Sequence, residues 1–192
     1  MFIAVLHLFL TVPVSAAAPS VINLDKAGAR VEFLAIGSPS AIKIRGKLSG
    51  DKPPLSGVLR LDGASLSGSA VVLLDGFDTG MELRNRHMKE KYLETRKWPT
   101  TELVLAKLTL PESCAVGDCV ASGIPLEGSL SLHGSKQTVT GLVAIKKTGG
   151  QMEAGFEFKF PLSDFGIETP SFMGISVTQA VTVTVAVNGT LE

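Results

Sequence analysis

The sequence lacks any excess of charge. Its 192 residues include 18 basic and 18 acidic side chains, so the formal net charge is zero. A protein that binds nucleic acid, or that is drawn as a whole to an anionic membrane, carries an excess of positive charge. Beyond the first fourteen residues there is also no apolar run of the roughly 20 residues that a membrane-spanning helix needs. The composition therefore predicts neither a nucleic acid partner nor stable membrane insertion.

The residues that usually carry catalysis are scarce. After the N-terminal apolar segment only two histidines remain, His87 and His133, and they are far apart in the sequence. There is no Gly-x-Ser-x-Gly turn, no His-Glu-x-x-His helix and no phosphate-binding glycine loop. Asp75 and Asp78 lack the further oxygen ligands of a calcium loop. We therefore expect no enzyme activity, no metal site and no resident cofactor other than a bound lipid.

Cysteine is also scarce, with only Cys114 and Cys119 in the chain. Two thiols without a nearby pair of histidines supply too few ligands for a tetrahedral zinc site. In an oxidising compartment the pair favours a disulfide, and free thiols are the alternative. Because the closed loop is short, such a bridge would contribute only about 2 kcal/mol by restricting the unfolded chain.

The N-terminus contains the longest apolar run, at residues 2–14, followed by small residues at 15–20. This pattern is typical of a secretory signal peptide, although no basic residue precedes the apolar run. We expect residues 1–18 to be a signal peptide and residues 19–192 to form one domain. That domain would be periplasmic or secreted.

The rest of the chain is rich in alternating apolar and polar residues. Phe156, Phe158 and Phe160 alternate with charged residues, and the valines from 181 to 187 alternate with small or polar ones. This period is typical of half-buried antiparallel strands. About seven similar segments, bounded by glycine and proline, lie near 30–36, 41–48, 56–62, 67–74, 101–110, 126–133 and 138–147. Turn signals at 47–57 and 147–151 predict hairpins there.

An all-β chain with few helices must protect the edges of its sheet. It does so by closing the sheet into a barrel or by packing it against a second sheet in a sandwich. The alternation alone leaves both options open. A barrel of about eight strands has room for side chains or for one small elongated ligand.

A charged segment, 78–99, interrupts the strands. Thr79 followed by Glu82 is a capping-box pattern, which predicts that a short helix begins there and extends over 79–94. Met81, Met88 and Tyr92 are spaced so that they share one face of this helix.

Three motifs resemble the YceI-like family of secreted lipid-binding proteins. They are the segment from Thr79 to Pro99 with Arg84, Asn85, His87 and Met88; Leu132 to Thr140, which reads LHGSKQTVT; and Leu162 to Ile167, which reads LSDFGI. Their order and spacing match the family over most of the chain after residue 18. The family commonly has Asp in place of Asn85 and Tyr in place of Trp98.

The resemblance implies a single antiparallel, lipocalin-like β-barrel of about eight strands, with the helix lying across its rim. It further implies a long apolar ligand such as a polyisoprenoid, an isoprenoid quinone or a fatty-acid-like lipid. Arg84, His87 or Tyr92 would contact the polar end of that ligand.

Flexible methionines and flat aromatic rings suit a long chain that has no polar features. Packing in the core is the alternative role for the phenylalanines, and His133 is expected to be structural. The complete set of candidate ligand-binding residues is Phe33, Arg84, His87, Met88, Tyr92, Trp98, Phe156, Phe158, Phe165, Phe172 and Met173.

The sequence thus predicts a periplasmic carrier that holds a long apolar ligand inside a barrel. The alternative is a sandwich or barrel without a ligand that acts as an interaction module for an envelope or membrane redox partner. A second copy of the chain, forming a homodimer, is a further partner to be considered.

Overall fold

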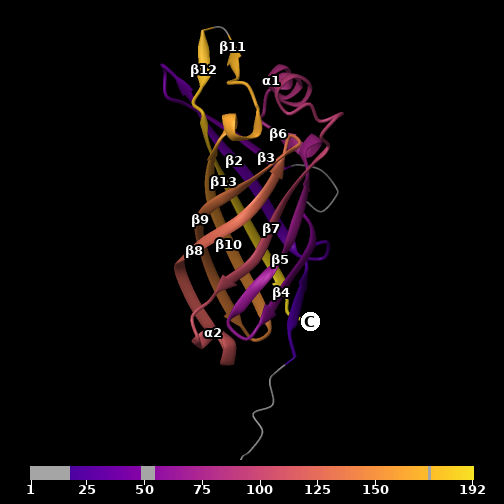
Figure 1. Cartoon of the computed structure of the whole chain (residues 1–192), viewed down its shortest axis with the longest axis vertical. Helices are drawn as coiled ribbons and strands as arrows, with labels where there is room; N and C mark the ends of the chain where they lie inside the picture. The colour runs from indigo at the N-terminus through magenta and orange to yellow at the C-terminus, as the bar shows by residue number, and fades with distance from the viewer. Residues whose placement is uncertain (1–17, 49–54, 173) are drawn as a thin grey trace, which may run out of the picture.

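One antiparallel sheet curls around a central axis and forms the body of the protein (Figure 1). The structure is a computed structural model, and it describes residues 18–48, 55–172 and 174–192. The predicted signal peptide therefore lies almost entirely outside the described residues. The strands are β1 (Ser20–Asn23), β2 (Gly28–Ser38), β3 (Ile42–Leu48), β4 (Ser56–Asp62), β5 (Ser65–Leu73), β6 (Phe77–Asp78), β7 (Thr100–Thr109), β8 (Cys119–Leu132), β9 (Ser135–Thr148), β10 (Gln151–Pro161), β11 (Ser171–Phe172), β12 (Ile175–Val177) and β13 (Ala180–Thr190).

The long strands follow an up-and-down order around the barrel. Strands β4, β5, β7, β8, β9, β10 and β13 are successive neighbours, β13 pairs with β2, and β2 pairs with β3. Among the described residues β3 and β4 do not pair with each other, and a short strand lies beside each of them along this seam. At one end β1 pairs with β4 while Val21 and Glu192 exchange backbone hydrogen bonds of 2.8 and 2.9 Å, and at the other end β6 pairs with β3. The all-β, lipocalin-like barrel is confirmed, with short extra strands beyond those expected.

One of the two predicted hairpins was wrong. Strand β3 pairs with β2 and β6, and β4 pairs with β1 and β5, so the connection at 47–57 does not join two neighbouring strands. Glycine and proline signal a chain reversal but do not specify which strands meet afterwards. The other hairpin is confirmed, because Thr148 pairs with Gln151 across Gly149 and Gly150, which have φ angles of 56° and 81°.

The alternating residues divide between the two faces of the sheet as predicted. Phe156, Phe158 and Phe160 are buried on the inner face, and the intervening Glu157 and Lys159 are exposed on the outer face. At the closed end the interior is filled with side chains that have almost no exposed surface, among them Ile22, Leu66, Val143 and Met152. The short helix α2 (Ser113–Val116) lies at this end, and a disulfide joins Cys114 to Cys119 there.

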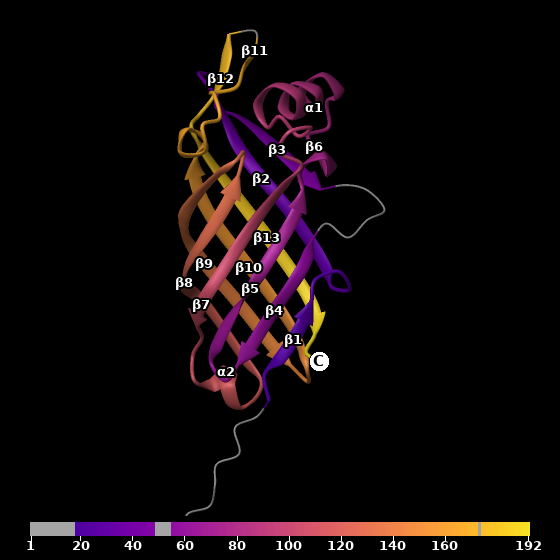
Figure 2. The same cartoon turned by 45° about the vertical axis from the view of Figure 1, so that its right-hand side comes forward.

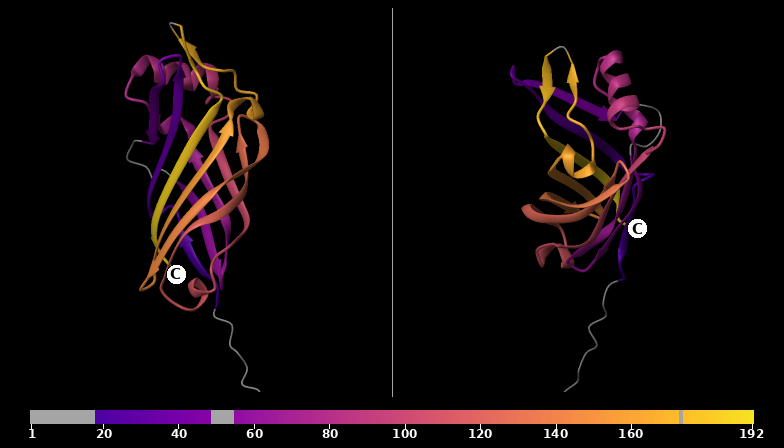
Figure 3. Two further views of the ribbon diagram at one scale, coloured as in Figure 1. Left: turned by 90° about the vertical axis from the view of Figure 1, so that its left-hand side faces the viewer. Right: turned by 45° about the horizontal axis from the view of Figure 1, so that its top comes forward.

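The opposite end carries the helical segment. Helix α1 (Glu82–His87) continues into a wider turn, η2 (Met88–Tyr92), and both lie near the β2–β3 and β11–β12 hairpins (Figure 2). We call the opening bordered by these three elements the mouth; Figure 3 shows them at the end of the barrel away from the C-terminus. No helix within the described ranges combines the length and the apolar character needed to cross a bilayer.

The capping box predicted at Thr79 is not formed. The helix begins at Glu82 with Met81 in the N-cap position, and no side chain caps it. The Thr79 hydroxyl instead donates to Oδ1 of Asn85 at 2.6 Å. The Thr79 hydroxyl, which the capping pattern assigned to a backbone N–H of the helix, is therefore bonded to the side chain of Asn85, the fourth residue of α1.

Candidate binding cavity

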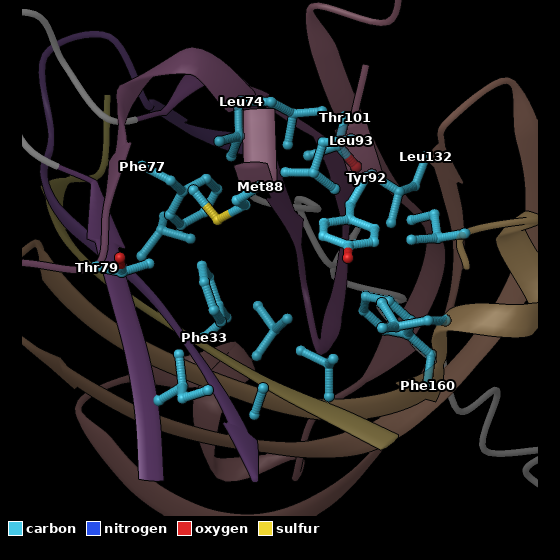
Figure 4. Close-up of a pocket in the computed structure, with 18 of the residues that line it drawn as sticks. Phe33, Leu74, Phe77, Thr79, Met88, Tyr92, Leu93, Thr101, Leu132 and Phe160 are labelled. Atoms are coloured by element: carbon cyan, nitrogen blue, oxygen red, sulfur yellow. The ribbon is translucent and has the colours of Figure 1, made fainter. Parts of the chain in front are cut away.

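The half of the barrel near the mouth encloses a cavity of about 550 Å³ (Figure 4). Its walls are apolar and come from nearly every long strand. Among the described residues, few polar side chains line it: Thr79, Arg84, His87, Tyr92, Thr101 and Ser171. The Thr101 hydroxyl already donates to the Ser131 carbonyl at 2.8 Å, so this wall offers a ligand little polar contact.

One face of the helical segment closes part of the cavity. Met88 and Tyr92 lie four residues apart on this face and both line the cavity. Met81 also lines it, but it precedes α1 with an extended backbone, so the three do not share one helical face as predicted. In Figure 4, Met88 projects into the space beside Phe77, and Tyr92 points toward the wall that carries Phe160. The Tyr92 hydroxyl accepts from the Ser171 backbone N–H at 3.2 Å, which links η2 to β11 across the mouth.

A polar cluster fixes the start of α1. Asn85 donates through Nδ2 to Oδ1 of Asp78 at 2.7 Å, and its own Oδ1 accepts from the Thr79 N–H at 2.8 Å. Arg84 donates through Nε to the Thr79 hydroxyl at 2.8 Å and through its terminal nitrogen to the Thr79 carbonyl. The hydrogen bond from Asn85, followed by that from the Gly80 N–H, lowers the pKa of Asp78 below its usual value of 3.8.

A second polar contact fixes the end of the helical segment. His133 lies 2.8 Å through Nε2 from Oε2 of Glu94, and its Nδ1 lies 3.0 Å from the Phe165 carbonyl. The two partners lie on opposite sides of the ring, so they fix its orientation at the end of the helical segment. His133 and Glu94 have φ angles of 52° and 45°, a region that residues other than glycine rarely adopt.

Seven predicted site residues line the cavity: Phe33, Arg84, His87, Met88, Tyr92, Phe156 and Phe158. Two others lie elsewhere in the described structure. Phe165 is buried and packs edge-on against Phe160 at a ring distance of 5.0 Å. Trp98 covers the two-residue turn of β8 and β9, where a Cβ atom on Gly134 would lie 2.6 Å from its ring. The Phe172 side chain and Met173 lie outside the described part.

The prediction missed two aromatic residues that line the cavity. Phe160 shares the alternation of Phe156 and Phe158, and this signal was available in the sequence. Phe77 lies in the two-residue strand β6 and packs edge-on against Phe33 at 5.3 Å. A strand of this length has no alternation of apolar and polar residues, so the sequence could not predict that the Phe77 side chain points inward. Within the described residues, no group of three or more His, Cys, Asp or Glu side chains is placed to hold a metal ion.

The fold and the cavity define a small antiparallel barrel with an apolar interior that opens at one end. The chain belongs to the YceI-like domain family, which it matches over residues 23–189. Among curated proteins, none matches the chain.

Several solved structures share the fold. A polyisoprenoid binding domain from Saccharophagus degradans, described as implicated in plant cell wall breakdown, has a TM-score of 0.61 and 13% identity, covering 91% of this chain and 99% of its own. Burkholderia cenocepacia BcnA has a TM-score of 0.66 and 18% identity, with coverage of 88% and 99%. The Campylobacter jejuni YCEI protein has a TM-score of 0.54 and 17% identity, with coverage of 77% and 84%.

The contact between Asp78 and Asn85 can be tested by Asn85→Asp. This change removes the Nδ2 donor and places a second carboxylate against Asp78, so we expect the backbone amides of α1 to exchange faster at neutral pH. In the unsubstituted protein the lowered pKa of Asp78 stabilises the fold above pH 3.8, and that contribution is lost as the pH falls through the lowered value. In the variant, the protection of the α1 amides against exchange should instead increase as the pH falls, because protonation of one carboxylate removes the repulsion. Hydrogen exchange measured across this pH range distinguishes the two trends.

The matched control for this experiment exchanges the two groups. Asp78→Asn combined with Asn85→Asp again places one amide against one carboxylate, and it should restore the slow exchange of α1. Equal exchange in the single and double variants would show that charge repulsion is not the cause.

A double-mutant cycle tests the contact between Glu94 and His133. We expect Glu94→Ala and His133→Ala to show a coupling of about 0.5–1.5 kcal/mol in the free energy of unfolding, because the His133 side chain is largely buried. The control is the cycle between Lys146 and Glu153, whose Nζ and Oε1 atoms lie 3.3 Å apart. Their side chains are 54% and 56% exposed. This control cycle should give less than about 0.5 kcal/mol. A smaller coupling for the Glu94 pair than for this control would contradict its role as an anchor.

Proposed function

We propose that this protein binds one long apolar molecule, with the chain of the ligand inside the barrel and its polar end at the mouth. The observation that carries the proposal is an apolar cavity of about 550 Å³ inside a single curled sheet. Cavities of this size accommodate ligands of several hundred daltons. A polyisoprenoid, an isoprenoid quinone or a fatty-acid-like lipid has the required shape and lack of polar groups.

The energetics favour such a ligand. Each methylene group that moves from water into the cavity contributes about 0.8 kcal/mol, so a chain of about ten carbons supplies about 8 kcal/mol before ordering costs.

The polar residues indicate how the ligand is oriented. Thr79, Arg84 and His87 belong to the segment at the mouth, whereas the strands below contribute apolar side chains. Arg84 uses two of its five N–H donors on Thr79, and the side chain also borders the cavity. The remaining donors suit a carboxylate or phosphate at the end of the ligand. Binding, without a chemical change to the ligand, is the proposed activity.

The proposed location is the periplasm or the cell exterior. It is supported by the apolar N-terminal sequence with its small residues, and by the disulfide between Cys114 and Cys119, a bond that persists in oxidising compartments. Similarity of fold to a protein described as a polyisoprenoid binding domain supports the ligand class. The alternative of a packed sandwich does not fit a single sheet around a cavity.

Filling the cavity should abolish binding. Val185 lines the cavity, and Thr184 points outward from the same strand, β13. We expect Val185→Trp to lower the uptake of a fluorescent long-chain ligand more than about tenfold, because the ring occupies the space of the chain. Thr184→Trp adds the same ring to the outer face and should bind normally. Equal uptake by both variants, or ligand-free protein after mild extraction from cells together with no saturable uptake, would favour the interaction-module alternative.

Arg84 should distinguish acidic from neutral ligands. We expect Arg84→Gln to weaken the binding of a long-chain fatty acid about tenfold, or about 1.4 kcal/mol, because a charge-assisted hydrogen bond is lost. The alcohol of the same chain length should bind with unchanged affinity and serves as the internal control. Calorimetric titration measures both ligands, and a parallel loss for the acid and the alcohol would show that Arg84 only shapes the cavity.

A further inference from the structure

Three large apolar side chains at the mouth are exposed to solvent. Ile42 is 44% exposed, Met81 is 55% exposed and Leu83 is 39% exposed, and all three also line the cavity. Ile42 lies at the start of β3, and the other two lie beside the start of α1. The apolar wall of the cavity therefore reaches the outer surface at these three residues. Figure 3 shows the β2–β3 hairpin and α1, the elements that carry them, at the same end of the barrel.

Exposed basic side chains flank these apolar residues. Lys43 and Arg45 lie on the outer face of β3 beside Ile42, and Arg86 lies on α1. None of the three has an ion pair or a side-chain hydrogen bond with another residue of the described structure. The acidic residues of segment 77–92 are Asp78, Glu82 and Glu90. The same segment holds Arg84, Arg86, Lys89 and Lys91, and Lys43 and Arg45 lie on β3, so the cations outnumber the carboxylates around the mouth. The nearby Lys89, in contrast, has an acidic partner, because its Nζ lies 4.0 Å from Oδ1 of Asp75.

We propose that the mouth docks on the surface of a bilayer that contains anionic phospholipids. Ile42, Met81 and Leu83 would enter the boundary between headgroups and acyl chains, and Lys43, Arg45 and Arg86 would lie at the phosphates. Exposed apolar residues surrounded by basic ones are the combination that holds peripheral proteins at such surfaces.

This inference rests on the proposed function, because a long apolar ligand resides in membranes. Contact between the mouth and the bilayer gives the ligand a continuous apolar path from the acyl chains into the cavity. Without that contact the chain would have to cross water, at about 0.8 kcal/mol for each exposed methylene group.

The first test reverses the three charges without changing the cavity. Lys43, Arg45 and Arg86 do not line the cavity, so the variant Lys43→Glu, Arg45→Glu, Arg86→Glu should still take up a soluble short-chain fatty acid. We expect its binding to vesicles of phosphatidylcholine with phosphatidylglycerol to fall about tenfold or more. The matched control is Arg60→Glu, Lys107→Glu, Lys159→Glu, which reverses three exposed cations on β4, β7 and β10. It should bind these vesicles as the unsubstituted protein does.

The second test shows which face meets the bilayer. Vesicles with bromine-labelled acyl chains should quench the added fluorescence of Met81→Trp but not that of Val120→Trp, which is exposed on β8 away from the mouth. Equal quenching at both positions would overturn the proposed orientation.

The outcomes separate this inference from the proposed function. If the unsubstituted protein takes up the soluble fatty acid but does not bind the anionic vesicles, docking on a bilayer is wrong and a protein partner remains as the occupant of the mouth. If it takes up no apolar ligand in any form, the proposed function itself fails.

Discussion

The inner face of the sheet is apolar, and its side chains pack together at one end of the barrel but leave a cavity toward the other end. At the closed end, residues such as Leu66 and Met152 have no exposed surface and pack as an ordinary core. Near the mouth the same alternation places Val183 and Val185 against a cavity. The closed end supplies the stability of the fold, and this allows the other end to remain hollow. The curl of a single sheet, with β1 paired with β4 and β6 paired with β3 at the seam, makes both regions possible.

The helical segment depends on polar contacts more than on packing. No residue of α1 is buried, and Tyr92 is the buried residue of η2. The segment is instead held at its start by Asn85 and Asp78 and at its end by Glu94 and His133. Glu94 and His133 adopt left-handed backbone conformations that glycine would adopt at lower cost. Their side chains form a hydrogen bond that glycine could not make, which explains why these residues occupy strained positions.

Local patterns predicted the faces of the strands but not which inward residues would line a cavity. A period of two determined that Phe156, Phe158 and Phe160 point inward. The helical period that grouped Met81 with Met88 and Tyr92 did not hold, because Met81 lies before α1. Whether an inward ring packs or lines a cavity depends on the curvature of the whole sheet, which no short segment encodes. Phe165 and Trp98 illustrate this, since Phe165, the last residue of η3 (Leu162–Phe165), packs against Phe160 and Trp98 covers the Gly134 turn. The capping pattern at Thr79 failed for a related reason, because Asn85 engaged its hydroxyl.

The balance of charge in the whole chain conceals an uneven distribution. A net charge of zero correctly argues against a field that extends over the entire protein. At physiological salt, however, charges interact over only about 8 Å, so a surface responds to the residues in its immediate neighbourhood. Lys43, Arg45 and Arg86 lie at the mouth without acidic partners in the described structure, whereas Lys146 on the outer wall lies 3.3 Å from Glu153. The net charge of the whole chain predicts no attraction to an anionic membrane. The exposed cations at the mouth predict such an attraction, and the apolar cavity opens at the same end. The proposed docking follows from this local arrangement and not from the overall composition.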